Sequence, residues 1–112
     1  MYVDSIPVTI VANTSQSAPF NLAQYQYAGI HVGKTWTTCC IGVTESPSEF
    51  GTYVPYVTNS AVAFGIPSLP SRFYVIPQEF VGASRWVRVY CHSAGNPIVQ
   101  VAATSVIVLR KG

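Results

Sequence analysis

The sequence predicts an all-β fold, a single-domain β-sandwich or jelly roll of about eight short antiparallel strands. Apolar residues make up 49% of the chain and charged residues only 9%, which excludes a disordered chain and a charge-rich helical bundle. Short runs that alternate between apolar and polar side chains are separated by turn signals about every ten residues, and none keeps a helical period. The 112 residues suit one domain, and no repeat or linker divides residues 1–112.

The N-terminal half is expected to hold an edge strand followed by a hairpin. Residues 5–11 alternate between apolar and polar side chains, which predicts a half-buried strand, and Pro7 favours the edge of a sheet. Two further strands are expected over residues 25–32 and 36–43. Because a Gly-Lys turn signal lies between them, we expect these two strands to pair as a hairpin.

The C-terminal half is expected to hold shorter strands between loops. Residues 44–51 and 66–71 are predicted loops because of their Pro, Gly and Ser content. One helical turn is expected over residues 77–82, with Gly82 closing it. Residues 85–92 carry bulky side chains on both faces, which predicts a central strand between two layers. The other expected strands are residues 52–57, interrupted by Pro55, residues 61–65, residues 72–76 and one bent or two short strands within residues 98–109.

The low charge predicts that part of the surface is buried against a partner. A net charge of +2, from six basic and four acidic residues, does not form the basic patch of a nucleic-acid-binding protein. Protein interfaces are poor in Lys, Glu and Asp and rich in aromatic residues and Arg. This chain has 7 Tyr, 5 Phe and 2 Trp, so we expect a member of an assembly. A homo-oligomer is expected, because closed symmetric assembly is the usual outcome for such a surface.

The sequence predicts a protein that is made and kept in a cytosol, or released from one by lysis. Residues 98–109 are too short to cross a bilayer as a helix, which needs about 20 residues, and the N-terminus lacks the pattern of a signal peptide. Three cysteines do not form a disulfide framework, so Cys39, Cys40 and Cys91 are interpreted as small buried residues. A disulfide between Cys91 and either Cys39 or Cys40 is the alternative.

No motif predicts an enzyme, a metal site or a bound cofactor. His31 and His92 lack neighbours at metal-ligand spacing. Glu45 and Glu49 are the only close pair of carboxylates, and in a Ser/Pro-rich loop they are interpreted as solvated side chains. The Gly-Lys-Thr at residues 33–35 lacks the first glycine of a phosphate-binding loop.

Aromatic side chains predict an alternative function, a carbohydrate-binding module for host recognition. Tyr25 and Tyr27 are expected on one strand face, and Trp36 opens the next strand. Trp86 is expected to share a face with Arg88 on the strand at residues 85–92. Such aromatic platforms bind sugar rings, although they are also ordinary cross-strand pairs and supports for an Arg side chain.

Two segments carry a resemblance to a known class of proteins. In residues 76–91 a proline, a phenylalanine and a glycine precede Arg-Trp-Val-Arg-Val-Tyr-Cys, and residues 35–43 are followed by a Thr-Tyr-Val-Pro strand at residues 52–55. Together they resemble small virion proteins of tailed bacteriophages that have a β-sandwich fold. The resemblance spans residues 25–110, and the Cys39–Cys40 pair departs from the class pattern.

This resemblance implies a structural role in the virion and no catalytic residues. Proteins of this class decorate or cement capsids or lie in the tail. We therefore expect a capsid cement or decoration protein that bridges subunits of the phage head. Its expected partners are the major capsid protein or other virion subunits. Its expected location is the capsid surface, after synthesis in the host cytoplasm.

Partner-binding residues are expected on segments that the sandwich core does not need. A β-sandwich buries its alternating strand residues, which leaves loops and termini for partners. Arg110 and Lys111 have no acidic residue near them in sequence, so their charges are expected to be available to another subunit. The expected binding residues are Met1, Tyr2, Val3 and Asp4 in an N-terminal arm, Glu45 and Glu49 in the loop at residues 45–51, Arg72 in the loop at residues 67–72, and Arg110 and Lys111.

Overall fold

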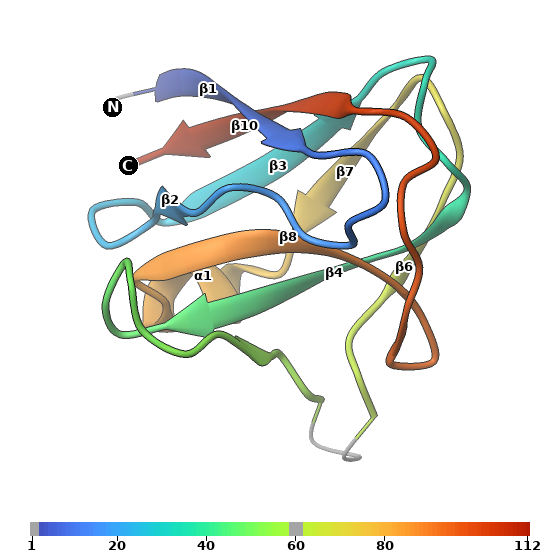
Figure 1. Ribbon diagram of the computed structural model, residues 1–112. Helices are drawn as coiled ribbons and strands as arrows, with labels where there is room; N and C mark the ends of the chain where they lie inside the picture. Colours follow the sequence, from blue (N-terminus) through green and yellow to red (C-terminus); the bar gives the residue numbers. More distant parts are fainter. Residues whose placement is uncertain (1–2, 59–61) are drawn as a thin grey trace.

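The computed structural model describes residues 3–58 and 62–112, and these form two antiparallel sheets packed face to face (Figure 1). The all-β prediction is therefore confirmed. The elements are β1 (Val3–Ile10), β2 (Phe20–Asn21), β3 (Tyr27–Val32), β4 (Cys39–Ser46), β5 (Val54–Pro55), β6 (Ile66–Ser68), β7 (Arg72–Ile76), α1 (Gln78–Ala83), β8 (Trp86–Ser93), β9 (Asn96–Pro97) and β10 (Thr104–Lys111).

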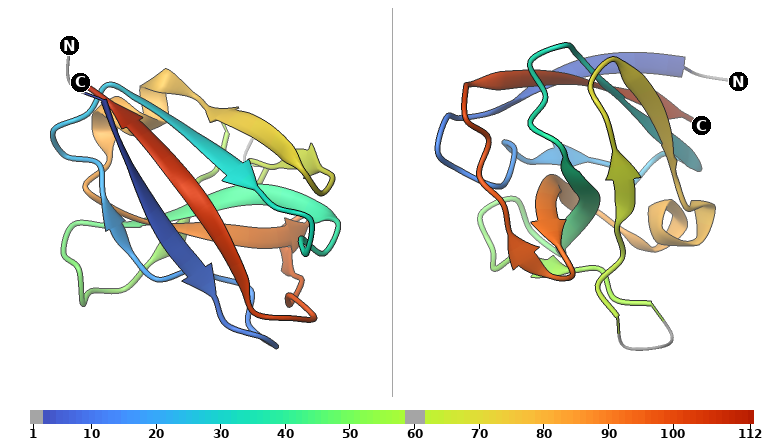
Figure 2. Two further views of the ribbon diagram at one scale, coloured as in Figure 1. Left: turned by 90° about the horizontal axis from the view of Figure 1, so that it is seen from above. Right: turned by 90° about the vertical axis from the view of Figure 1, so that its right-hand side faces the viewer.

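Each sheet joins segments that are far apart in the sequence. Sheet A has the strand order β1-β10-β3-β7, so the first and last strands are neighbours. Sheet B has the order β2-β8-β4-β5, with β6 also paired to β4 and β9 to β8. Seen from above in Figure 2, the four strands of sheet A lie side by side over sheet B. The predicted edge position of β1 is confirmed.

Alternating apolar residues from both sheets fill the core. Val8 and Ile10 of β1 point inward, as the alternation predicts, and Val87, Val89 and Cys91 of β8 are completely buried. Strand β8 lies between β2 and β4, which confirms its predicted central position. The core follows from the period of two residues in a strand, because every second side chain meets the opposing sheet.

The predicted hairpin is wrong, because β3 lies in sheet A and β4 in sheet B. Between them, the chain crosses from one sheet to the other. Trp36 is only 3% exposed, and its indole N–H donates a hydrogen bond to Ser68 Oγ at 2.9 Å. The buried Gln100 side chain accepts a hydrogen bond from the Thr37 amide at 2.8 Å. The Gly-Lys turn signal predicts a reversal of the chain but not the sheet in which the next strand pairs.

Several shorter predictions in the C-terminal half also differ from the structure. Residues 66–68, predicted as a loop, form β6 because they pair with β4. In the predicted strand at residues 61–65, residues 62–65 form only a single bridge, from Ala63 to Val57, and residue 61 lies outside the described part. Helix α1 is confirmed but runs past Gly82, because the Ser84 hydroxyl caps the Phe80 carbonyl at 2.7 Å. Of residues 98–109, only those from Thr104 onward form a strand.

The cysteines are free thiols in the structure. Cys39 and Cys91 are buried, as predicted, whereas Cys40 is half-buried on the opposite face of β4. A hydrogen bond with Cys39 and burial together raise the pKa of the Cys91 thiol, which keeps it protonated. Cys39 and Cys91 therefore act as small core residues.

Candidate interaction surfaces

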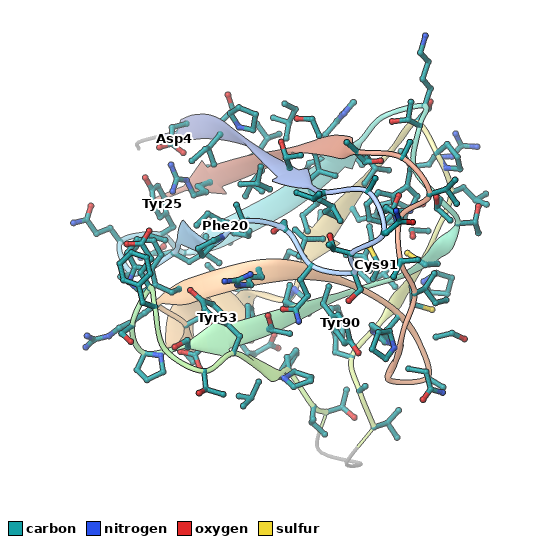
Figure 3. The ribbon with its side chains drawn as sticks, in the orientation of Figure 1. Asp4, Phe20, Tyr25, Tyr53, Tyr90 and Cys91 are labelled. Carbon is teal, nitrogen blue, oxygen red and sulfur yellow. The ribbon has the colours of Figure 1, made fainter. Side chains whose placement is uncertain are left out.

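An ion-pair cluster joins the two chain ends. Arg110 Nε lies 2.8 Å from Asp4 Oδ1, and a second guanidinium nitrogen lies 2.9 Å from Asp4 Oδ2. The Tyr25 hydroxyl also donates to Asp4 Oδ2 at 2.9 Å, and the Arg110 guanidinium stacks 4.7 Å above the Tyr25 ring. Figure 3 shows Asp4 and Tyr25 close to each other at one end of the sandwich. This two-point contact fixes the ends of β1 and β10 to each other.

The cluster corrects the prediction that Arg110 is available to a partner. Asp4 lies 106 residues away in sequence, but β1 and β10 pair so that Asp4 is directly opposite Arg110. Likewise, Val3 is opposite Lys111, so residues 3, 4, 110 and 111 belong to paired strands and not to free arms. Met1 and Tyr2 lie outside the described residues. Only a correct prediction of the pairing of the first and last strands could have revealed the cluster.

The outer face of sheet A is uncovered and largely apolar. Val3 is 60% exposed, Val75 is 65% exposed and Phe73 is 48% exposed. Across the sheet, Leu109 and Val75 lie on either side of Gly29, which the Phe73 ring overlies, and no described segment passes over this surface (Figure 2). We call this surface the bare face; its apolar residues are Val3, Tyr27, Phe73, Val75, Ile107 and Leu109. Contiguous apolar surface of this kind is typical of protein contacts.

The charged groups of the bare face and its ends are basic. Lys111 lies on the bare face, with its ammonium 5.7 Å from the Tyr27 ring centroid. Arg72 is exposed at the start of β7, and Lys34 is exposed in the connection after β3. The Asp4 carboxylate of sheet A is already paired with Arg110. The bare face therefore favours an apolar partner with acidic groups around it.

The outer face of sheet B, in contrast, is covered by other parts of the chain. The Arg88 guanidinium stacks 4.5 Å above the Tyr53 ring of the segment after β4. The buried His92 donates from Nε2 to the Phe64 carbonyl at 2.8 Å, and its Nδ1 accepts from the Gly95 amide at 3.0 Å. These contacts hold loops against sheet B and leave its inner strands, β4 and β8, mostly buried.

An acidic groove lies between α1 and β5. It has a volume of about 370 Å³, and its walls are mainly apolar side chains, including Val54, Tyr56 and Phe80. Its charged lining residues are Glu45 and Glu79. Glu45 and Glu49 are both half-buried, which corrects their interpretation as fully solvated side chains. Phe50, next to Glu49, is 93% exposed in the loop after β4.

A third surface gathers exposed valines at the loop end of the sandwich. The segment at residues 11–14 and the segment at residues 98–101 are joined because the Asn13 amide donates to the Gln100 carbonyl at 2.8 Å. The backbone N–H of Gln100 donates in turn to the Thr14 carbonyl at 2.9 Å. We call this surface the valine patch; it consists of Val11, Val99 and Val101, all exposed.

The four predicted sugar-binding aromatics do not form one face. Trp36 is buried in the core, and Tyr25 is half-buried under Arg110. Tyr27 lies on the bare face of sheet A, whereas Trp86 is half-buried on β8 of sheet B. Pairing along β3 and β8 separates these rings, so the predicted platform is wrong.

The described residues offer no grouped metal ligands. Residues 3–58 and 62–112 contain no cluster of three or more His, Cys, Asp or Glu side chains that could hold a metal ion. His31 is exposed on sheet A, whereas His92 is buried in sheet B. In the same part of the chain, no helix is both long and apolar enough to cross a membrane.

The fold is similar to that of a solved prophage protein. The chain matches no protein-family profile and no curated protein sequence. The crystal structure of the SPBc2 prophage-derived protein YomS aligns with a TM-score of 0.54 over 98% of this chain and 95% of that chain. The two sequences are 13% identical, so the likeness concerns the fold.

Proposed function

We propose that this protein is a bacteriophage virion protein that binds the capsid surface and cements neighbouring subunits of the head. The observation that carries the proposal is the presence of two separate apolar surfaces, the bare face and the valine patch, on a chain with 9% charged residues. A cement protein needs at least two contact surfaces, because it must hold two neighbours at once. The similarity in fold to a prophage-derived protein agrees with a phage origin.

Binding alone explains how such a protein would stabilise a shell. Its binding surface exists only when capsid subunits are assembled, so each bound copy shifts the equilibrium towards the intact shell. The partner is the major capsid protein or another virion subunit, and no catalytic residue or cofactor is needed. Free copies are proposed to form a homo-oligomer. A trimer is favoured over a dimer, because decoration proteins commonly follow the local symmetry of a shell.

The valine patch is the surface that we assign to the shell. It lies on loop segments, whose side chains are free to serve binding because the strand pairs of the core do not need them. Val101 is 76% exposed, and the segment that carries it is fixed by the hydrogen bonds of the buried Gln100. A fixed, exposed apolar side chain loses little conformational freedom on binding, which favours contact.

The test uses phage heads purified without this protein. We expect added protein to sediment with the heads and to raise the temperature at which they release DNA. Val101→Asp should weaken binding at least about tenfold, because it places a charge in an apolar contact. Val62→Asp, a similar change at another exposed valine, should bind like the wild type. Failure of the wild-type protein to bind heads, or equal binding by both variants, would contradict the proposal.

A further inference from the structure

Exposed basic groups at sheet A and the carboxylates of the acidic groove lie on different sides of the molecule. Lys34, Arg72 and Lys111 lie on sheet A or at the ends of its strands. The carboxylates of Glu45 and Glu79 lie in the acidic groove between α1 and β5. In Figure 1, sheet A forms the upper layer, whereas α1 and β5 lie in the lower part of the molecule. The basic surface and the acidic surface therefore face different directions.

The two surfaces also match in polarity. The bare face is apolar at its centre, with Phe73 and Val75 exposed. Lys111 lies on it at one end, and Arg72, whose register partner Val32 is buried, lies at the rim of the other end. The acidic groove has apolar walls, with Val54 exposed, and carboxylates as its charged groups. An apolar centre with opposite charges around it is the pattern of two complementary protein surfaces.

We infer that the bare face of one copy binds the acidic groove of a second copy of this chain. The alternative, two bare faces packed against each other about a twofold axis, brings like charges together. Lys111 and Arg72 lie at opposite ends of sheet A. Depending on its direction, a twofold axis brings each of these residues towards the same residue of the second copy or towards the other basic residue of that copy. Both arrangements oppose basic groups, whereas the acidic groove attracts them.

A contact between unlike surfaces leaves each copy with one bare face and one groove still to fill. Such a contact continues from copy to copy and produces either a closed ring or an open row. The inference extends the proposed function, because it names the surfaces through which copies would contact each other on a shell. The valine patch is not part of this contact and stays available to the capsid.

The size of the bare face sets the expected strength of the contact. Four strands about 4.8 Å apart and roughly six residues long cover an area on the order of 300 Å². Stable interfaces bury about 800 Å² on each partner, so the contact should be weak in solution. Copies held next to each other on a shell would bind more completely, because their effective concentration is higher.

The test is sedimentation velocity of the free protein from about 10 µM to about 1 mM, the range in which weak contacts form. The wild-type protein should show an average mass that rises with concentration and falls with added salt. Arg72→Glu combined with Lys111→Glu should weaken association at least about tenfold, and so should Glu45→Lys combined with Glu79→Lys. Arg85→Glu, the same type of change outside both surfaces, should associate like the wild type.

Mixing the two double variants gives the decisive result. The bare face with glutamates in place of its basic residues then meets the groove with lysines in place of its carboxylates. The mixture should therefore regain the association that each variant alone has lost. Glu79→Lys alone serves in place of the second double variant if unfolding curves show that Glu45→Lys disturbs β4. A wild-type protein that stays monomeric throughout, groove variants that associate normally, or a mixture that does not recover would each overturn the inference. Because no shell is present, these outcomes are separate from those of the head-binding test.

Discussion

Gly42 on β4 and Gly29 on β3 both face outward from an inner strand, but their surroundings are opposite. A Cβ added to Gly42 would lie 2.6 Å from His92 Nε2 and 2.7 Å from the Phe64 carbonyl oxygen. A Cβ added to Gly29 would overlap only the ring of Phe73, a side chain that is itself exposed. At Gly42 the outside of sheet B is thus packed against backbone and a buried side chain, whereas at Gly29 the nearest atoms outside sheet A belong to one exposed, movable ring.

This difference shows that the outer faces of the two sheets are shielded from water to different degrees. A sheet that is apolar on both faces buries one of them in the core. Its outer face is then either covered by other segments of the chain or left exposed to solvent. The chain uses the segments after β4 and before β6 to cover sheet B. For the second face of sheet A, the described residues provide no such cover, which is why we assign that face to contacts with another molecule.

The two histidines give the largest expected contrast. His92→Ala should lower the free energy of unfolding by about 2 to 4 kcal/mol, because it leaves a cavity and two unpaired backbone groups, the Phe64 carbonyl and the Gly95 amide. His31→Ala, on the exposed face of sheet A, should change it by less than about 0.5 kcal/mol. Urea unfolding curves measure both, and equal losses would contradict the view that only sheet B is covered.

The two glycines give a smaller contrast. Gly42→Ala should cost about 1 to 3 kcal/mol of stability, because the Phe64 backbone and the buried His92 ring cannot move aside. Gly29→Ala should cost less than about 1 kcal/mol, because the Phe73 ring can rotate into solvent. Thermal unfolding of the two variants checks the order. A larger loss for Gly29→Ala would mean that Phe73 is held in place by contacts that the isolated chain lacks.

The exception within sheet A is the ion-pair cluster at the chain ends. Asp4→Asn should lower the free energy of unfolding by about 1 to 2 kcal/mol, because the Arg110 guanidinium, which is largely buried, loses its charged partner. Lys111→Gln removes a charge from the neighbouring, exposed position and should cost less than about 0.5 kcal/mol. Chemical unfolding compares the two, and an unchanged Asp4→Asn variant would show that the cluster does not stabilise the ends of β1 and β10.

The smallest effect on stability is expected on the bare face itself. Val75→Thr should change the free energy of unfolding by less than about 0.5 kcal/mol, because Val75 is 65% exposed. The same change should reduce the association of free copies, since it makes the centre of the proposed contact more polar. Unfolding curves and sedimentation of one sample measure both effects. A clear loss of stability would place Val75 in the fold rather than in a contact.

The sequence by itself determined the local character of the strands. Alternation predicted which residues of β1 and β8 point inward, and Val8, Ile10, Val87 and Val89 are all buried. Pro7 predicted the edge position of β1, because proline lacks the backbone N–H that a residue of an inner strand donates to a neighbouring strand. These predictions succeeded because the direction of a side chain depends only on its own position in the strand.

The tertiary structure decided everything that depends on which strands meet. It separated β3 and β4 into different sheets, placed Asp4 against Arg110 and buried Gln100 from a segment without regular structure. It also divided the predicted sugar-binding aromatics between the core and both sheets. Pairing between remote strands follows from the packing of the whole chain, because the same alternating pattern can pair equally well with several partners. For the same reason, only the assembled sandwich shows that sheet B is covered while sheet A presents an apolar, basic face to solvent.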